Sequence, residues 1–169
     1  MRPILRTAAL LLVVTALASP RLRAQVVSQP VLSADGVRKA LAAAEAEARR
    51  NGWNVSIAVV DPAGTLLGFL KMDDASAASV EVSQAKARSA GRFRRATKVF
   101  EESVAGGRAA IMSLSGVVAI EGGVPMLVDG KVVAAVGVSG ATSAQDGQVA
   151  AAGIVGAGGT VPAPPAPAR

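Results

Sequence analysis

The fold is decided by residues 122–146, which read GGVPMLVDGKVVAAVGVSGATSAQD. Two apolar runs rich in β-branched residues, 124–128 and 132–138, flank the pair Asp129-Gly130. An Asp-Gly pair favours the positive φ angles of a tight two-residue turn. The stretch therefore predicts a β-hairpin that closes at Asp129-Gly130.

The end of this stretch predicts a turn followed by a helix. Gly137 and Gly140 bracket Val138 and Ser139 and allow a sharp turn or a close backbone approach. Two interpretations remain open for these glycines and for Gly122 and Gly123: they serve turns and close strand packing, or they open one wall of a ligand pocket. Thr142 or Ser143 can then cap a helix, with Asp146 near its positive end.

The rest of the chain alternates helical and extended patterns. Helical spacing and the N-cap candidate Ser33 indicate a helix that ends at Gly52, and basic residues crowd the second half of a longer helix. In chain order we expect helix 33–52, strand 55–60, turn 61–64, strand 65–72, helix 75–100, a loop at 105–107, an extended segment 112–120, the hairpin, and helix 143–155. This order, α-β-β-α-β-β-β-α, predicts an α+β domain with a five-stranded antiparallel sheet and helices packed on it.

The two ends of the chain differ from this domain in composition. Arg2 and Arg6 precede the apolar run 7–18, and small residues follow, so residues 1–24 predict a signal peptide cleaved after Ala24 or, alternatively, after Ala18. An exported, periplasmic or secreted protein with no membrane anchor after cleavage is expected. Residues 156–169 are almost entirely Gly, Pro and Ala and predict a disordered tail, which leaves 25–155 as the domain.

Charge and missing residue types restrict the chemistry. Of 18 basic residues, four precede Gln25, so the mature chain has 14 against 12 acidic residues and a net charge of +2. That balance, with export, argues against nucleic-acid binding. The chain has no Cys, His or Tyr, which excludes disulfides, thiolate sites, histidine bases and the usual catalytic triad. An enzyme without a cofactor is correspondingly disfavoured, and enzymatic activity stays open.

Several short motifs resemble the GlcG/HbpS-like family of small haem-binding or haem-degrading proteins. They are Gly122-Gly123-Val124-Pro125, Gly137-Val138-Ser139-Gly140 and Gln145-Asp146, preceded in order by Val59-Val60-Asp61 with Gly64, Met72-Asp73, and Lys86-Ala87-Arg88-Ser89-Ala90 with Phe93 and Thr97. The similarity spans Leu32 to Val155. It implies a profilin-like α+β domain, a homo-oligomer and a haem ligand.

The resemblance also suggests site residues. It implies that Thr97 lies near the haem iron, although a hydrogen bond at a helix end is an equally simple role for this hydroxyl. Arg88, Arg92 and Arg95 are candidates for pairing with the haem propionates, because guanidinium groups bind carboxylates in bidentate fashion. A solvated helix face is the alternative for these arginines. Phe93 and Val138 are expected to line the apolar wall.

Axial ligation is the weak point of a haem hypothesis. Common protein ligands are His, Cys, Met and Tyr, and after residue 24 only Met72, Met112 and Met126 remain, each a candidate for core packing.

The sequence leaves two candidate functions. One is an exported protein that sequesters haem or assists its oxidative degradation, and the other is a non-catalytic accessory module that binds another small organic ligand or organises a complex.

Overall fold

The computed structural model describes residues 27–163 as one α+β domain with four helices, one 3-10 helix and four strands. The elements, in chain order, are α1 (Ala34–Arg50), β1 (Ser56–Val60), β2 (Leu66–Lys71), α2 (Ala77–Phe93), α3 (Thr97–Ala105), the 3-10 helix η1 (Ala109–Ser113), β3 (Gly123–Val128), β4 (Lys131–Ser139) and α4 (Ser143–Gly156). The predicted signal peptide, residues 1–24, lies outside the described residues.

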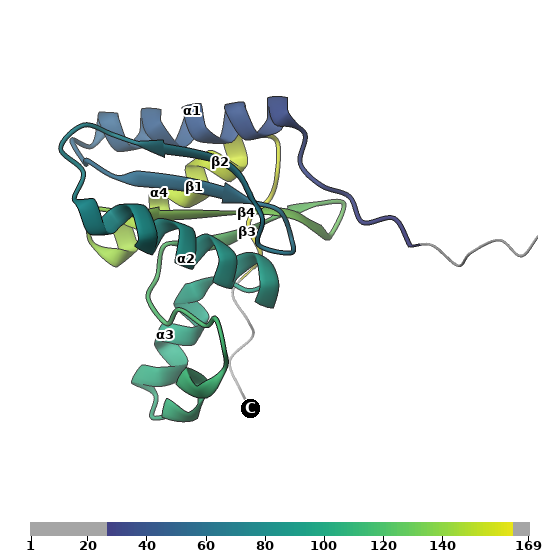
Figure 1. Ribbon diagram of the computed structural model, residues 1–169, viewed down its shortest axis with the longest axis vertical. Helices are drawn as coiled ribbons and strands as arrows, with labels where there is room; N and C mark the ends of the chain where they lie inside the picture. Colours follow the sequence, from purple (N-terminus) through teal and green to yellow (C-terminus); the bar gives the residue numbers. More distant parts are fainter. Residues whose placement is uncertain (1–26, 164–169) are drawn as a thin grey trace, which may run out of the picture.

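The sheet is antiparallel throughout, with the strand order β2-β1-β4-β3. Helices α1 and α4 cover one face and α2 covers the other, while α3 and η1 project away from the sheet (Figure 1). Successive residues of the central strand β1 therefore point into different layers: Ile57 packs with α1 and α4, and Ala58 packs with α2.

The predicted hairpin is confirmed. Strands β3 and β4 pair from Gly123↔Gly137 to Val128↔Lys131, and the turn residues Asp129 and Gly130 have φ angles of 49° and 72°. Both angles are those of a type I′ turn, the geometry that matches the twist of the flanking strands. Helix α4 follows with Thr142, one of the two predicted N-cap candidates, as its N-cap, and the structure adds a capping box with Gln145.

Glycine lets α2 lie unusually close to the sheet. A Cβ atom added at Gly137 of β4 would overlap the Ser83 carbonyl oxygen and the Ala87 backbone nitrogen of α2. Gly123 of β3 meets the Lys86 carbonyl in the same way. Close strand and helix packing, one of the two roles left open for these glycines, is therefore what the fold uses them for.

The prediction of five strands is wrong, because the sheet of the described residues has four. The predicted extended segment 112–120 includes the end of η1, and its remainder crosses the outside of α2 without pairing to a strand. There the Val118 amide donates a hydrogen bond to Ser89 Oγ at 3.1 Å. The Ser89 hydroxyl on α2 thus accepts a backbone hydrogen bond that a carbonyl of a neighbouring strand would otherwise have accepted.

The helix predicted over residues 75–100 is two helices. Arg94 ends α2 in the left-handed region, with φ 52° and ψ 38°, and α3 begins at Thr97 after the N-cap Ala96. Of the predicted tail, residues 164–169 lie outside the described residues, while Thr160 pairs with Leu127 at the free edge of β3. The observed element order is consequently α-β-β-α-α-β-β-α, with η1 after α3.

Within residues 27–163, none of the helices has both the length and the apolar character needed to cross a membrane.

Candidate functional site

A groove of about 800 Å³ lies where the α2–α3 junction faces α4. We call it the α3–α4 groove. Its lining residues come from the junction and α3, from Glu121 and β3, from α4, and from the C-terminal segment. Those with apolar side chains are Ala96, Val99, Val124, Ala144, Ala151, Val161, Pro162 and Ala163. The volume falls within the range of sites that hold small organic ligands.

Charged side chains are placed at the same groove. Arg94, Arg95 and Lys98 line it together with Glu102 and Glu121. Lys98 Nζ lies 3.0 Å from Glu121 Oε2, and this hydrogen bond and the Glu121 charge raise the pKa of Lys98. No acidic partner lies within ion-pair distance of Arg94 or Arg95 among the described residues, so both guanidinium groups are available to an anion.

The backbone turns sharply at Arg94, and this turn forms the basic side of the groove. The left-handed conformation of Arg94 lets the Arg94 amide bond to Gly91 O and the Arg95 amide to Ala90 O. The Arg95 guanidinium carbon then lies 6.0 Å from the centre of the Phe100 ring. A cation over an aromatic face is held in a defined direction.

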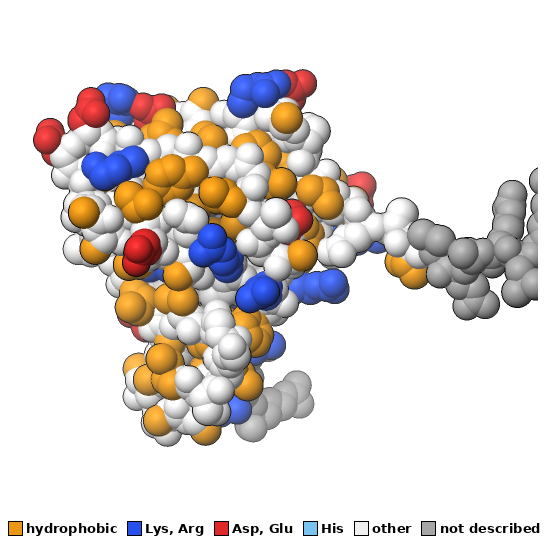
Figure 2. All heavy atoms as spheres, viewed as in Figure 1, with side chains coloured by type: hydrophobic (Ala, Val, Ile, Leu, Met, Phe, Trp, Pro, Cys, Tyr) orange, Lys and Arg blue, Asp and Glu red, His pale blue; other side chains and the backbone are white. Residues whose placement is uncertain are grey.

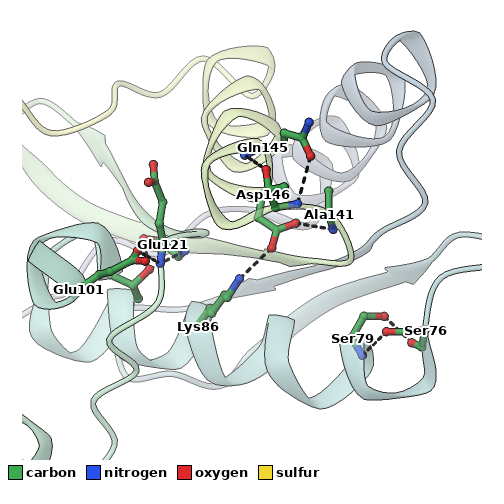
Figure 3. A network of polar contacts seen from close by, with 11 residues as sticks. Ser76, Ser79, Lys86, Glu101, Glu121, Ala141, Gln145 and Asp146 are labelled. Carbon is green, nitrogen blue, oxygen red and sulfur yellow. Dashed lines mark hydrogen bonds and ion pairs between the residues drawn. The ribbon is translucent and has the colours of Figure 1, made fainter. Parts of the chain in front are cut away.

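A buried ion pair fixes the two helices on either side of the sheet. Lys86 of α2 and Asp146 of α4 are each about 2% exposed, and Lys86 Nζ lies 2.8 Å from Asp146 Oδ2 (Figure 3). Asp146 Oδ1 also accepts a hydrogen bond from the Ala141 amide at 3.1 Å. Burial raises the pKa of Asp146, and Lys86 counteracts only part of that increase.

Glu121 is another charged residue that lines the groove. Its amide donates to Glu101 Oε2 at 2.7 Å, and its side chain rests against Gly147 of α4, where an added Cβ would lie 2.7 Å from Glu121 Oε1 (Figure 3). The carboxylate of Glu121 thereby reaches Lys98 from the α4 side. A glycine at position 147 is what allows this arrangement.

Of the six residues predicted for the site, only Arg95 lines the groove. Arg88 and Arg92 are exposed on α2 near the β1–β2 turn, where Arg88 bonds to Gln84 Oε1 and Arg92 Nε bonds to Ala63 O. Both therefore lie on a solvated helix face, which was the alternative to pairing with the haem propionates. Figure 2 shows basic side chains exposed on the face of the molecule that α2 covers.

The apolar residues predicted for the wall lie elsewhere. Val138 is completely buried in the core between the sheet and the helices α1 and α4, and it does not line the groove in this conformation. The Phe93 ring packs edge-on against Phe100 with 5.4 Å between the ring centres, and Phe93 is not among the groove residues. Alternation along β4 explains the first result, because Gly137 rather than Val138 faces α2.

Thr97 has the structural role that the sequence left open. Its hydroxyl is fully buried, accepts a hydrogen bond from the Gly123 amide at 2.9 Å and lies 3.4 Å from the Gly123 carbonyl oxygen. Thr97 therefore joins the start of α3 to the start of β3 beside the glycine motif. The groove is lined by its neighbours Ala96 and Lys98 but not by Thr97 itself.

The stability of a Thr97→Val variant tests this role. Valine has nearly the same shape but no acceptor, so the buried Gly123 amide loses its partner, and we expect the free energy of unfolding to fall by about 1–3 kcal/mol. Urea denaturation measures the change. Ser103→Ala, which removes only a local bond to Val99 O within α3, is the matched control and should cost less than about 1 kcal/mol. A hemin spectrum that changes while stability does not would instead place Thr97 at the iron.

Metal ligands of the usual kinds do not gather at the groove. No group of three or more acidic, histidine or cysteine side chains among residues 27–163 is placed to hold a metal ion. Met72 and Met126 are core residues, and Met112, which is 56% exposed, lies in η1. What the groove offers to a ligand is apolar surface and cationic side chains.

Three comparisons with known proteins agree with one another. The family model described as haem degrading protein HbpS-like matches residues 32–155. Protein GlcG of Escherichia coli (strain K12) is 48% identical over 109 residues, which are 64% of this chain and 81% of GlcG. The crystal structure of HbpS superposes with a TM-score of 0.73 at 31% identity over 78% of this chain and 93% of HbpS.

A further solved structure, the PduOC:haem complex, matches with a TM-score of 0.69 at 28% identity over 75% of this chain and 94% of that chain. Residues 32–155, which the family model matches, contain the whole sheet, the helices except the last residue of α4, and every groove residue except 161–163. The protein therefore belongs to the GlcG/HbpS-like family.

Proposed function

We propose that this protein binds haem in the α3–α4 groove. The family model is described as a haem-degrading protein, and one structural neighbour was solved as a haem complex. The observation that carries the proposal is the composition of the groove, which joins apolar walls to Arg94, Arg95 and Lys98. A haem has the same two halves, an apolar ring and two carboxylates.

The groove suits the ring and the propionates better than it suits the iron. Val99 of α3, Val124 of β3 and Ala151 of α4 offer small apolar surfaces to a flat ring. Among the described cations that line the groove, Arg94 and Arg95 have no acidic partner and are offered to the carboxylates, whereas Lys98 is paired with Glu121. With no His, Cys or Tyr in the sequence and no Met in the groove, the iron lacks a common protein ligand.

Binding of this kind makes haem exchangeable. Its energy comes from burial of the ring and from the propionate contacts, so affinity is modest and haem can be passed on. In this role the protein sequesters haem or assists its oxidative degradation, for which bound haem itself supplies the iron chemistry. The chain's own residues hold the ring, orient its carboxylates and exclude water from one face.

Titration of purified residues 25–169 with hemin tests the proposal. We expect a saturable change in the Soret band and a dissociation constant that rises with salt, because part of the attraction is between charges. Protoporphyrin IX, which has the ring and propionates without iron, should compete with hemin. Unsaturable hemin absorbance would contradict haem binding and favour the alternative, an accessory module for another small organic ligand.

Export and self-assembly are two further parts of the proposal. The signal peptide pattern in residues 1–24 supports a periplasmic or secreted protein, and N-terminal sequencing should find Gln25 or Ser19 first.

Apolar side chains are exposed on the lobe of α3 and residues 106–120, including Met112, Leu114 and Ile120 at 56%, 48% and 49% (Figure 2). Contact between copies would cover them, so light scattering should give a mass above that of one chain.

A further inference from the structure

The chain does not leave the domain where α4 ends. The Gly159 amide bonds to Ile154 O at 3.0 Å and the Gly158 amide to Val155 O at 3.0 Å, with Gly158 at a φ of 83°. These two bonds and the left-handed glycine make a Schellman motif, which reverses the chain direction after a helix. The segment that follows is therefore directed back towards β3.

The segment is then attached to the free edge of the sheet. Thr160 and Leu127 exchange two backbone hydrogen bonds of 2.9 Å each. Gly159 is buried against Met126, whose Sδ would lie 3.2 Å from a Cβ added at Gly159. A larger residue at position 159 would push the segment off the strand.

Two prolines explain why this pairing stops after one bridge. In an antiparallel pair the hydrogen-bonded positions recur every second residue, so the next pair after Thr160 and Leu127 is Pro162 and Pro125. Neither proline has an amide hydrogen to donate. The chain is therefore released from the strand at Val161, and residues 161–163 line the α3–α4 groove instead.

We infer that residues 161–163 form a wall of the ligand site and that Val161 and Pro162 contact the bound ring. This inference rests on the proposed function. Val161 and Pro162 face a groove whose other walls are Val99, Val124 and Ala151, so together they enclose an apolar ligand from the β3 side. The wall is attached to the sheet at Thr160, and residues 161–163 follow this attachment point along the groove. This segment is therefore the part of the site that controls ligand escape.

Two truncations separate the wall from the rest of the tail. One ends at Thr160 and keeps the Schellman motif and the bridge to Leu127 but removes the wall, and the other ends at Ala163 and keeps all three residues. We expect hemin to dissociate about tenfold faster from the first, because apolar surface of the ring is exposed to water, and at the wild-type rate from the second. Transfer of hemin to excess apomyoglobin in stopped flow measures the rate.

A pair of point variants supports the truncations and does not depend on how a shortened chain folds. Val161→Asp places a carboxylate in the wall and should weaken hemin binding about tenfold, because it repels the propionates and interrupts the apolar surface. Val155→Asp makes the same chemical change on α4 at a residue that is 65% exposed and outside the groove, and it should bind hemin as wild type does.

The outcomes distinguish this inference from the proposed function. Wild-type protein that fails to bind hemin overturns both. If the wild-type protein binds hemin, and both truncations and Val161→Asp keep the wild-type rate and affinity, only the inference about the wall is overturned. Equal acceleration in both truncations also overturns it, because the effect then belongs to residues beyond Ala163.

Discussion

Asp146→Ala is expected to lower the free energy of unfolding by about 3–5 kcal/mol, the largest loss that we predict for one substitution. The variant leaves the Lys86 ammonium, which is 2% exposed, inside the protein without its partner 2.8 Å away. It also removes the acceptor of the Ala141 amide before α4. Urea denaturation at pH 7 measures the loss.

Two further variants show whether the buried charge is the cause. Lys86→Met combined with Asp146→Asn leaves no buried charge and keeps an acceptor for Ala141, so it should be more stable than Asp146→Ala. Glu45→Ala removes an exposed ion pair with Arg49 and should cost less than about 1 kcal/mol. A loss below about 1 kcal/mol for Asp146→Ala would contradict the importance of the buried pair.

The pH dependence of stability provides a signature of the same residue. Because burial raises the pKa of Asp146 above its ordinary value of 3.8, the folded protein binds this proton more tightly than the unfolded chain does. Stability contributed by Asp146 therefore falls as the pH rises from 3.8 through the folded pKa. Asp146→Asn should remove that part of the pH dependence.

The second large effect concerns hemin affinity. Arg94→Glu and Arg95→Glu should each weaken hemin binding by about one to two orders of magnitude, because a hydrogen bond to a charged group contributes about 1.5–3 kcal/mol and the new carboxylate repels a propionate. Titration of the Soret band gives the dissociation constants. The effect should shrink in high salt.

Arg88→Glu and Arg92→Glu are the matched controls. They make the same change in charge on α2, but these arginines lie beside the β1–β2 turn and not at the groove. We expect their hemin affinity to stay within about threefold of wild type, since only long-range screened attraction is lost. Loss of binding in these variants, with Arg94→Glu and Arg95→Glu unaffected, would move the haem site to the outer face of α2.

Local signals in the sequence predicted much of the fold. Asp129-Gly130 specified the hairpin turn, Thr142 and Ser33 capped their helices, and Gly52 follows α1 with a φ of 69°. Each of these signals acts within a few residues and does not depend on tertiary contacts. They were therefore readable without the structure.

The fifth strand and the groove could not be read in the same way. The apolar run 117–120 has the composition of a strand, but its Val118 amide bonds to the distant Ser89 on α2 and not to a neighbouring strand. The break at Arg94 was hidden because arginine carries no preference for the left-handed region, in contrast to glycine or asparagine. The sequence thus showed a basic cluster but not which of its arginines turn towards α4.

The location of hemin tests the central claim most directly. Hemin iron is paramagnetic and broadens the NMR signals of nearby amides, so a titration of ¹⁵N-labelled protein maps the site residue by residue. We predict that the amides of Lys98, Val99, Gly147 and Ala151, on the two sides of the groove, broaden first. Broadening centred on Ala63 and Arg88, with the groove signals unchanged, would contradict the account.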